Sequence, residues 1–207
     1  MARKRRSYST GPVIHLCNRA AGQLTLFQSP FEYKQILTVF REALEKFPVS
    51  VFAFCIMPNH WHLLCRTQET GILSRFMHWF GTTHAMRWRI SHENVGRGAV
   101  YQNRFRSHRV EGTQAFLKTA AYIERNALAA GLVQKASAWP WGSASPENDF
   151  PLSPWPHSKP GSWSHILDDP LDGETLRLLR YAQRSSHTFK ITPPKTPELA
   201  EALKAVS

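Results

Sequence analysis

The chain has 207 residues, 42% of them hydrophobic, which suffices for one packed domain with an appendage but is short for two full domains. No apolar run approaches the roughly 20 residues of a transmembrane helix, and the basic N-terminus is not followed by the apolar core of a signal peptide. The three cysteines, Cys17, Cys55 and Cys65, lack zinc-type spacing, so we expect buried thiols in a reducing cytoplasm.

Positive charge is concentrated in the first part of the chain. Lys and Arg number 26 against 15 acidic residues, a formal net charge of +11. Residues 1–150 hold 19 basic and 9 acidic side chains, whereas residues 151–207 hold 7 and 6. This excess is typical of proteins that bind nucleic acid, although a basic surface that only aids solubility would have the same composition.

The N-terminal third predicts strands around one long helix. Residues 12–17 and 23–27 are short apolar stretches on either side of a turn, and we expect a strand in each. Ser29-Pro30-Phe31-Glu32 is a capping box with proline at the first helical position, and the apolar spacing that follows predicts a helix over 30–47. The β-branched and aromatic residues of 49–57 predict a buried strand, and turn residues lead from it into a strand over 60–66.

The rest of the chain predicts two more long helices and an irregular end. We expect a helix over about 70–90, a loop over 91–104, a strand over 105–110 and a helix over 113–130 that ends at Gly131. Six prolines between 140 and 165 predict an irregular wrap, followed by a helix over 175–185. The order of elements predicts an α+β fold, an antiparallel sheet of four to five strands with helices packed on it. We assign residues 1–146 to this domain and 147–207 to a linker and C-terminal helical tail.

His60 and His62 flank Trp61 at the start of the strand predicted over 60–66. Because side chains alternate along a strand, both imidazoles lie on one face about 6–7 Å apart, where they can bind one metal ion. Two half-buried histidines with no metal would show the same short motif. The position of the pair inside an apolar sheet, directly after a Pro-Asn turn, favours the metal.

Tyr122 and Asn126 fall outside the apolar stripe of the helix predicted over 113–130 and, four residues apart, share one face. This placement suits a chemical role, although exposed tyrosines are common. Glu124 falls within the apolar stripe, and a buried carboxylate needs a partner. We expect an arginine or a hydrogen bond to a loop, in a structural role.

Six arginines and one acidic residue lie between Arg87 and Arg109, with aromatic residues among them. Guanidinium groups bind phosphates bidentately and aromatic rings stack on unpaired bases, so the segment favours single-stranded or distorted nucleic acid. Arg87 and Arg89 can instead form a solvated helix face. From this segment and other basic stretches we select as DNA-binding candidates Arg3, Lys4, Arg5, Arg19, Arg97, Tyr101, Gln102, Arg104, Arg106 and Lys118.

Several motifs occur together in one order over about residues 12–145: 57–64 (MPNHWHLL), 100–107 (VYQNRFRS), 122–127 (YIERNA), 130–133 (AGLV) and 139–143 (WPWGS). In this combination they resemble the REP-associated tyrosine transposases, a branch of the single-tyrosine HUH transposases with the IS200-like enzymes. The run 126–129 (NALA) departs from the more common Asn-Pro-Val-Arg, which removes a basic residue and keeps the amide. The segment around 176–189 resembles a degraded form of the family's basic C-terminal helix, without its Gly-Pro-Phe-Gly-like ending.

The resemblance implies a fold, a site and an activity. The fold is a ferredoxin-like sheet similar to that of RNA-recognition domains. Tyr122 is the implied nucleophile, and His60 and His62, with Asn126 as third ligand, the implied holders of Mg²⁺ or Mn²⁺. The implied activity is cleavage and rejoining of single-stranded DNA at hairpin-forming palindromic (REP) repeats through a 5′-phosphotyrosine, in the bacterial cytoplasm at the nucleoid. We expect no membrane partner and a monomer, although related swapped dimers place the tyrosine in a partner's site.

The chemistry of these residues agrees with that activity. A phenol has an ordinary pKa near 10 and needs assistance to attack as an anion, which a metal-polarised phosphate would provide. A metal phosphoesterase in which water attacks is the alternative enzyme, and it would leave no covalent protein–DNA adduct. A hairpin-binding regulatory protein with weak or no catalysis stays open too. A structural zinc site is least favoured, because the spacing of the cysteines does not suggest a closed cage of four ligands with the histidine pair.

Overall fold

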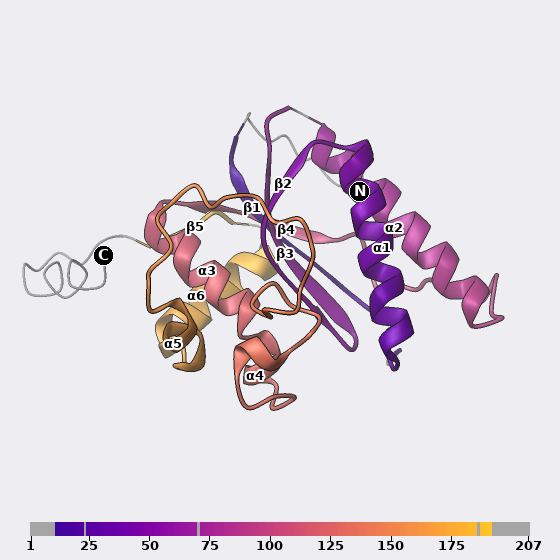
Figure 1. The fold of residues 1–207 in the computed structure, drawn as a ribbon. Helices are drawn as coiled ribbons and strands as arrows, with labels where there is room; N and C mark the ends of the chain where they lie inside the picture. The colour runs from indigo at the N-terminus through magenta and orange to yellow at the C-terminus, as the bar shows by residue number, and fades with distance from the viewer. Residues whose placement is uncertain (1–10, 23, 70, 186, 192–207) are drawn as a thin grey trace, which may run out of the picture.

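The computed structural model describes residues 11–22, 24–69, 71–185 and 187–191, which form one sheet with helices on both faces (Figure 1). Its five strands lie in the spatial order β2-β3-β1-β4-β5. In chain order they are β1 (Val13–Arg19), β2 (Val49–Met57), β3 (His60–Thr67), β4 (Arg106–Glu111) and β5 (Phe189–Lys190). The first four pair antiparallel, whereas β5 pairs parallel with β4. The predicted α+β fold is confirmed, with a sheet that is mostly antiparallel.

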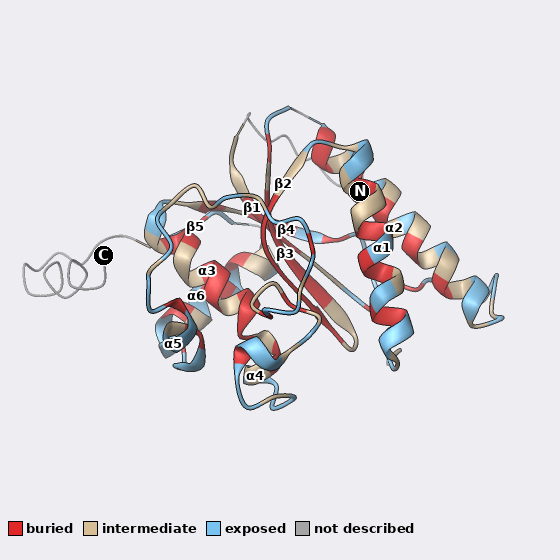
Figure 2. Cartoon of the chain, in the orientation of Figure 1, coloured by how far each residue is buried: buried red, intermediate tan, exposed pale blue. Residues whose placement is uncertain are grey.

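Two groups of helices enclose the sheet (Figure 1). One face is covered by α1 (Pro30–Lys46) and α2 (Ile72–Ser91). The opposite side carries α3 (Thr113–Glu124), α4 (Asn126–Ala129), the short 3-10 turn η1 (Ala136–Ala138), α5 (Trp163–Asp168) and α6 (Gly173–Ser185). Figure 2 shows the buried residues of these helices on the sides that face the sheet, with exposed residues on the outer surface.

Strand alternation divides the interior into two cores. Trp61 and Leu63 of β3 belong to the core shared with α1 and α2. Leu64 belongs to the core shared with α3 and α6, and His62, which alternates with Trp61, lies on that same side. The predicted alternation around the histidine pair is therefore present in the fold.

The start of α1 follows the predicted capping box. Glu32 Oε2 accepts hydrogen bonds from the backbone N–H of Ser29 at 2.8 Å and of Gln28 at 2.6 Å, and Pro30 is the first helical residue. These bonds satisfy amides that a helix leaves without intrahelical partners, so this boundary could be predicted closely.

Two sequence predictions about secondary structure are wrong in detail. The segment predicted as a strand over 23–27 has no strand in its described residues 24–27; the N–H groups of Leu26 and Phe27 both donate to the Pro58 carbonyl, at 2.8 and 3.1 Å. It therefore packs over the turn between β2 and β3 instead of pairing along a neighbour. The helix predicted over 113–130 breaks at Arg125, which ends α3 and precedes α4.

The segment after residue 146 packs against the domain. Trp163, Leu167, Leu179 and Phe189 share a core with Phe116 of α3. The domain boundary at residue 146 stays a prediction. Side chains that precede this residue and side chains that follow it pack in one shared core. In the part of the chain that the structure describes, no helix is both long and apolar enough for a membrane span.

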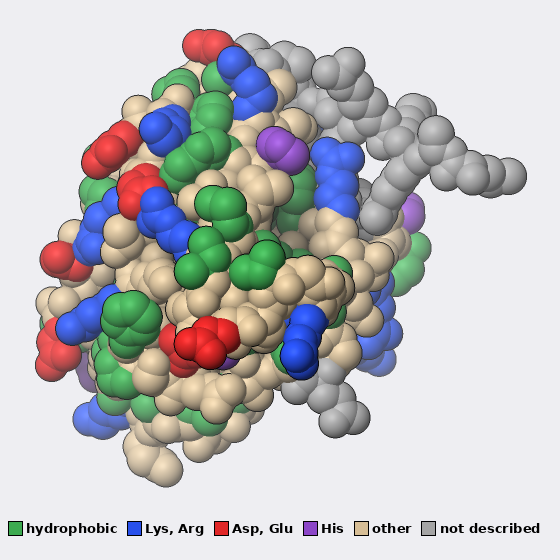
Figure 3. Space-filling view, turned by 90° about the vertical axis from the view of Figure 1, so that its right-hand side faces the viewer, with side chains coloured by type: hydrophobic (Ala, Val, Ile, Leu, Met, Phe, Trp, Pro, Cys, Tyr) green, Lys and Arg blue, Asp and Glu red, His purple; other side chains and the backbone are tan. Residues whose placement is uncertain are grey.

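The side of the molecule formed by α1 and α2 carries both signs of charge. Figure 3 shows basic and acidic side chains interspersed there. Arg87 donates to both carboxylate oxygens of Glu42, at 2.9 and 2.8 Å, and Arg89 donates to the Arg97 and Gly98 carbonyls, each at 3.0 Å. Both arginines thus have structural contacts, in line with the alternative considered for them above.

Candidate active site

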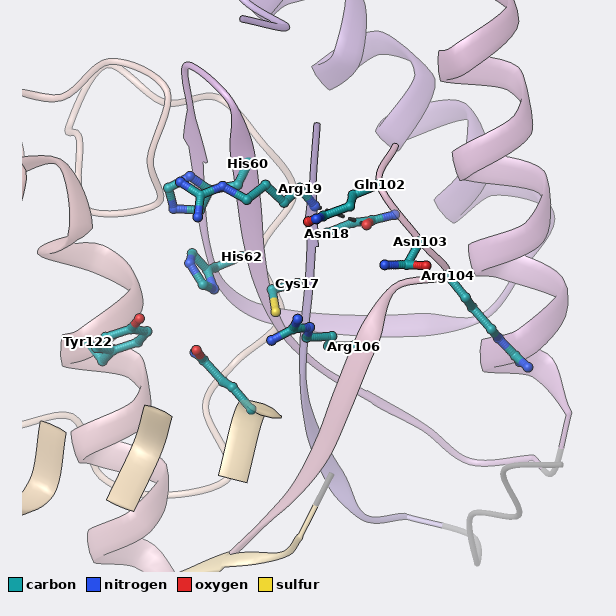
Figure 4. A pocket seen from close by; sticks show the side chains of 11 residues that line it. Cys17, Asn18, Arg19, His60, His62, Gln102, Asn103, Arg104, Arg106 and Tyr122 are labelled. Atoms are coloured by element: carbon teal, nitrogen blue, oxygen red, sulfur yellow. Dashed lines mark hydrogen bonds between the residues drawn. The ribbon is translucent and has the colours of Figure 1, made fainter. Parts of the chain in front are cut away.

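A pocket of about 240 Å³ opens on the side of the sheet that faces α3 (Figure 4). Strands β1, β3 and β4, the loop before β4, and helices α3 and α6 all contribute to its wall. The lining residues are Cys17, Asn18, Arg19, His60, His62, Gln102, Asn103, Arg104, Arg106, Tyr122 and Gln183.

Strand register assembles the floor of the pocket. Cys17 of β1 lies opposite His62 of β3 on one side and opposite Arg106 of β4 on the other, so the three side chains stand in a row across the sheet. Arg19 lies opposite His60 in the same way, and its side chain extends toward His60 (Figure 4). The loop before β4 is anchored to this floor, because Gln102 N–H donates to the Arg19 carbonyl at 2.9 Å.

His60 and His62 present neutral imidazoles to the pocket. Their ring centroids lie 5.1 Å apart with the planes nearly perpendicular. Burial, and secondarily Arg19, lowers the pKa of His60 to about 4, and burial holds the pKa of His62 well below its ordinary value. His60 Nδ1 lies 2.8 Å from Asn59 Oδ1, so the Nδ1–H donates to the amide and the lone pair remains on Nε2.

Tyr122 faces this pair from α3 (Figure 4). Its ring centroid lies 5.5 Å from that of His62, and Asn126 and Gln183 lie close enough to act on the phenol. Burial raises the pKa of the phenol, while Gln183, the nearby Arg180 and Asn126 act in the opposite direction. Asn126 also raises the pKa of His60, so one amide lies near both the candidate nucleophile and the histidine pair.

The side chains fit a divalent cation if Asn126 takes part. The described residues hold no group of three His, Cys, Asp or Glu side chains that could bind a metal. Two imidazole nitrogens and an amide oxygen remain, which leaves positions open for water or phosphate. The hydrogen bond from His60 to Asn59 is of the kind that orients metal-binding histidines. This donor set suits Mn²⁺ at least as well as Mg²⁺, because Mg²⁺ prefers oxygen ligands.

The predicted DNA-binding residues divide into three groups. Arg19, Gln102, Arg104 and Arg106 line the pocket, although Arg104 points away from the histidines (Figure 4). The structure does not bring Arg97, Tyr101 or Lys118 into the lining: Arg97 lies exposed after α2, and Lys118 pairs with Asp172 at 3.4 Å. Arg3, Lys4 and Arg5 lie outside the described residues.

Tyr101 is half-buried, and its hydroxyl is hydrogen-bonded to two buried side chains. Trp61 Nε1–H donates to this oxygen at 3.2 Å, and His84 Nδ1 lies 2.8 Å from it. Its oxygen therefore joins β3, α2 and the loop before β4 on the face of the sheet opposite His62. The predicted stacking role of Tyr101 with DNA stays a prediction, and the contacts that the structure shows are packing contacts.

Sequence reasoning missed several residues of the site. His15 and His108 lie behind His62, and Gln183 reaches Tyr122 from α6. His15 could have been selected from the sequence, since an imidazole in an apolar buried strand needs a hydrogen-bond partner. Gln183 carried none, because its proximity to Tyr122 depends on how the chain folds over the 60 intervening residues.

Glu124 is hydrogen-bonded, as predicted, and its partners among the described residues are a serine and a tryptophan, not an arginine. Its two carboxylate oxygens accept hydrogen bonds from Ser143 Oγ and Trp163 Nε1, each at 2.7 Å. Burial raises the pKa of this carboxyl, and the two donors oppose that shift. Glu124 thus ties α3 to the segment that follows α4 and to α5.

Comparison with known proteins gives two findings. Residues 11–126 match the family described as "Transposase IS200 like", a range that includes both histidines of the pair, Tyr122 and Asn126. The chain also resembles a solved structure described as "Structure of the REP associates tyrosine transposase bound to a REP hairpin". The TM-score is 0.57 and the identity 17%, over 69% of this chain and 82% of that one, so the likeness is one of fold. Among curated proteins, none matches the chain.

Proposed function

The chain belongs to the IS200-like transposase family, and on that basis we propose that it cleaves and rejoins single-stranded DNA at hairpin-forming palindromic repeats. The solved transposase that shares its fold is described with a REP hairpin bound, which supports a hairpin as the DNA partner. We expect this activity in the bacterial cytoplasm, at the nucleoid.

The main observation behind the proposal is that a phenol and two imidazoles of a single chain line one basic pocket. Tyr122, His60 and His62 share that pocket with Arg19 and Arg106. A phosphodiester in this position would have guanidinium groups for its charged oxygens and a nucleophile within reach of its phosphorus atom.

In the proposed reaction Tyr122 Oη attacks phosphorus. The bond between Tyr122 Oη and phosphorus forms and the bond between phosphorus and the 3′ oxygen breaks, giving a 5′-phosphotyrosine and a free 3′-OH. The phenolic proton leaves Tyr122, and the departing 3′ oxygen gains a proton. The number of phosphoester bonds does not change, so attack by another 3′-OH can reverse the step and rejoin DNA.

The pocket residues have separate tasks in this reaction. We propose that His60, His62 and Asn126 hold Mg²⁺ or Mn²⁺. When bound, the cation polarises the scissile phosphate and stabilises the charge that develops on its oxygens. Arg19 and Arg106 bind the phosphate itself. Burial makes the free phenol a weaker acid. Gln183, Arg180 and Asn126 act in the opposite direction, and they favour the charged form that must develop on Tyr122.

The test is a search for the covalent intermediate. Labelled hairpin oligonucleotides carrying repeats from the source genome are incubated with the protein and Mg²⁺ or Mn²⁺, then separated on a denaturing gel. We expect label to migrate with the protein, and we expect Tyr122→Phe to lose this adduct while it binds the hairpin normally. Tyr181→Phe, at an exposed tyrosine of α6, is the matched control and should retain the adduct.

The other outcomes identify the alternatives. Cleavage without an adduct, retained in Tyr122→Phe, would indicate a phosphoesterase in which water attacks. Tight hairpin binding with no cleavage in either metal would indicate a regulatory DNA-binding protein. Loss of metal-dependent cleavage in His60→Ala is expected, and full activity in that variant would refute the metal site.

One chain supplies every residue in this proposal, so we propose that a monomer is active. Mixing Tyr122→Phe with His60→Ala distinguishes this from a swapped dimer. A swapped dimer would regain adduct in the mixture, because one composite site would hold both intact groups. Two monomers with incomplete sites would remain inactive.

A further inference from the structure

Helix α6 brings two polar side chains to Tyr122. Gln183 lines the pocket together with Tyr122 and lies close enough to the phenol to lower its pKa. Arg180, one helical turn earlier, lies close enough to act on the phenol by its charge. The helix lies beyond residues 11–126, the part that matches the transposase family, so the family match does not include these two side chains.

Contacts at both ends hold α6 in place. At its start, Asp172 accepts hydrogen bonds from the N–H and the hydroxyl of Thr175, each at 2.7 Å, and pairs with Lys118 of α3. Along its length, Leu179 and Ala182 are buried in the core shared with α3. After it, β5 joins the edge of the sheet beside β4. Gln183 is therefore presented to the pocket from a fixed position, not from a free end.

The amide of Gln183 has Tyr122 as its contact at the pocket. Gln183 Nε2 is buried, and no hydrogen-bond partner for it occurs among the residues that the structure describes. A buried amide group without a partner is unfavourable by about 1–3 kcal/mol. Its retention beside a candidate nucleophile suggests that the group is kept for an interaction that forms during the reaction.

Asn126 has other tasks in that reaction besides Tyr122. Its side chain lies near both Tyr122 and His60, and under the proposed function its oxygen becomes a metal ligand. Gln183 is the amide beside the phenol that has no other task in the proposed reaction. An amide can accept from the phenol hydroxyl and donate to the same oxygen once it is negatively charged or bonded to phosphorus, so one side chain serves each stage.

We propose that Gln183 is a positioning residue for Tyr122: its amide holds the phenol oxygen toward the histidine pair, so the C-terminal segment completes the active site. This inference rests on the proposed function. It assigns to α6 a role in the chemistry, in addition to its packing.

The test compares three substitutions. Gln183→Met keeps the length of the side chain and removes the amide, whereas Gln183→Glu keeps the shape and places a negative charge beside the phenol oxygen. Leu178→Met, at an exposed position of the same helix, is the control. We expect the rate of adduct formation at saturating hairpin to fall about 10- to 100-fold in both Gln183 variants, and to stay unchanged in the control. Hairpin Kd and Tm should stay near wild-type values.

Two results would overturn the proposal. The first is a wild-type rate in Gln183→Met. The second is a near wild-type rate in Gln183→Glu together with a lower Tm in Gln183→Met, since a residue that only packs tolerates the isosteric change.

A second readout does not depend on cleavage. Protein labelled with ¹³C at the tyrosine Cζ atoms gives a Tyr122 resonance that is assigned by its absence in Tyr122→Phe. We expect this resonance to move in Gln183→Met and to stay in place in Leu178→Met. A resonance that stays in place in both refutes the contact. If the contact is present while wild-type protein forms no adduct with DNA, the proposed function has failed and the positioning of Tyr122 has not.

Discussion

Nε2 of His15 lies 2.9 Å from Nδ1 of His62, inside the sheet and behind the pocket. The His108 ring stands edge-on to His15 with centroids 4.8 Å apart. Burial lowers the pKa of all three imidazoles, that of His108 to about 4, so the row is neutral. Because Nδ1 of His62 is engaged by His15, Nε2 is the nitrogen left for a ligand in the pocket.

His15→Leu should therefore weaken metal binding without touching the pocket. Removal of the partner frees His62 to rotate and to exchange tautomers, and loss of such an orienting group typically lowers metal affinity about 10- to 100-fold. Titration of the protein with Mn²⁺ by calorimetry measures this directly. His15→Gln, which can still hydrogen-bond, should recover part of the affinity. Equal Mn²⁺ affinities in wild type and His15→Leu would contradict the orienting role.

Tyr101→Phe separates packing from DNA stacking at the loop before β4. The Tyr101 oxygen accepts from Trp61 Nε1–H, which directs its own proton to His84 Nδ1. Loss of the hydroxyl leaves two buried polar groups without a partner, so we expect the free energy of unfolding to fall by about 1–3 kcal/mol, measured by urea denaturation. Phenylalanine would preserve any stacking on a base. A variant as stable as wild type would contradict the interior role.

Local sequence patterns predicted the features of the fold that depend only on residues close together in the sequence. The alternation that places His60 and His62 together, and the capping box at Ser29, both arise within a few residues, and both are present. Tyr122 and Asn126 were predicted to share a helix face by a four-residue spacing. The helix breaks at Arg125, yet Asn126 still lies close enough to Tyr122 to lower the pKa of the phenol.

Contacts between distant segments could not be predicted in this way. Gln183 meets Tyr122 only because β5 and the cap at Asp172 fix α6 against the sheet. The apolar residues of 24–27 are compatible with a strand or with a loop packed on the core. This segment forms a loop in which the Pro58 carbonyl accepts the N–H groups of Leu26 and Phe27, which a strand would have used for pairing.

Substitution of the pocket arginines should change the salt dependence of hairpin binding, whereas substitution of an arginine on the opposite helices should not. Each phosphate contact on a single strand contributes about 0.7 to the slope of log Kd against log salt concentration. Arg19→Ala and Arg106→Ala should each reduce the slope by about that amount, because both residues line the pocket. Arg87→Ala, whose guanidinium is paired with Glu42, is the matched control and should leave the slope unchanged. Equal slopes in all four proteins would place the DNA elsewhere.

Asp172 should link the stability of α6 to acid pH. Hydrogen bonds from the N–H and the hydroxyl of Thr175, and then Lys118, lower the pKa of this carboxyl to about 2, below its value of about 3.9 in an unfolded chain. A lowered pKa means that the charged form stabilises the fold. The stabilisation is therefore complete above about pH 5 and is lost as the pH falls from about 4 through 2.

We expect Asp172→Ala to lower the free energy of unfolding by about 1 kcal/mol at pH 7, the usual effect of removing a helix cap. The difference from wild type should shrink as the pH falls from about 4 to 2, because the wild-type carboxylate becomes about half protonated at pH 2. Urea denaturation at a series of pH values measures both, with Glu69→Ala, at an exposed carboxylate, as the control. The adduct assay should follow the same variant, because a loosened α6 withdraws Gln183 from Tyr122. A difference from wild type that persists unchanged down to pH 2 would show that the charge of Asp172 does not act on α6.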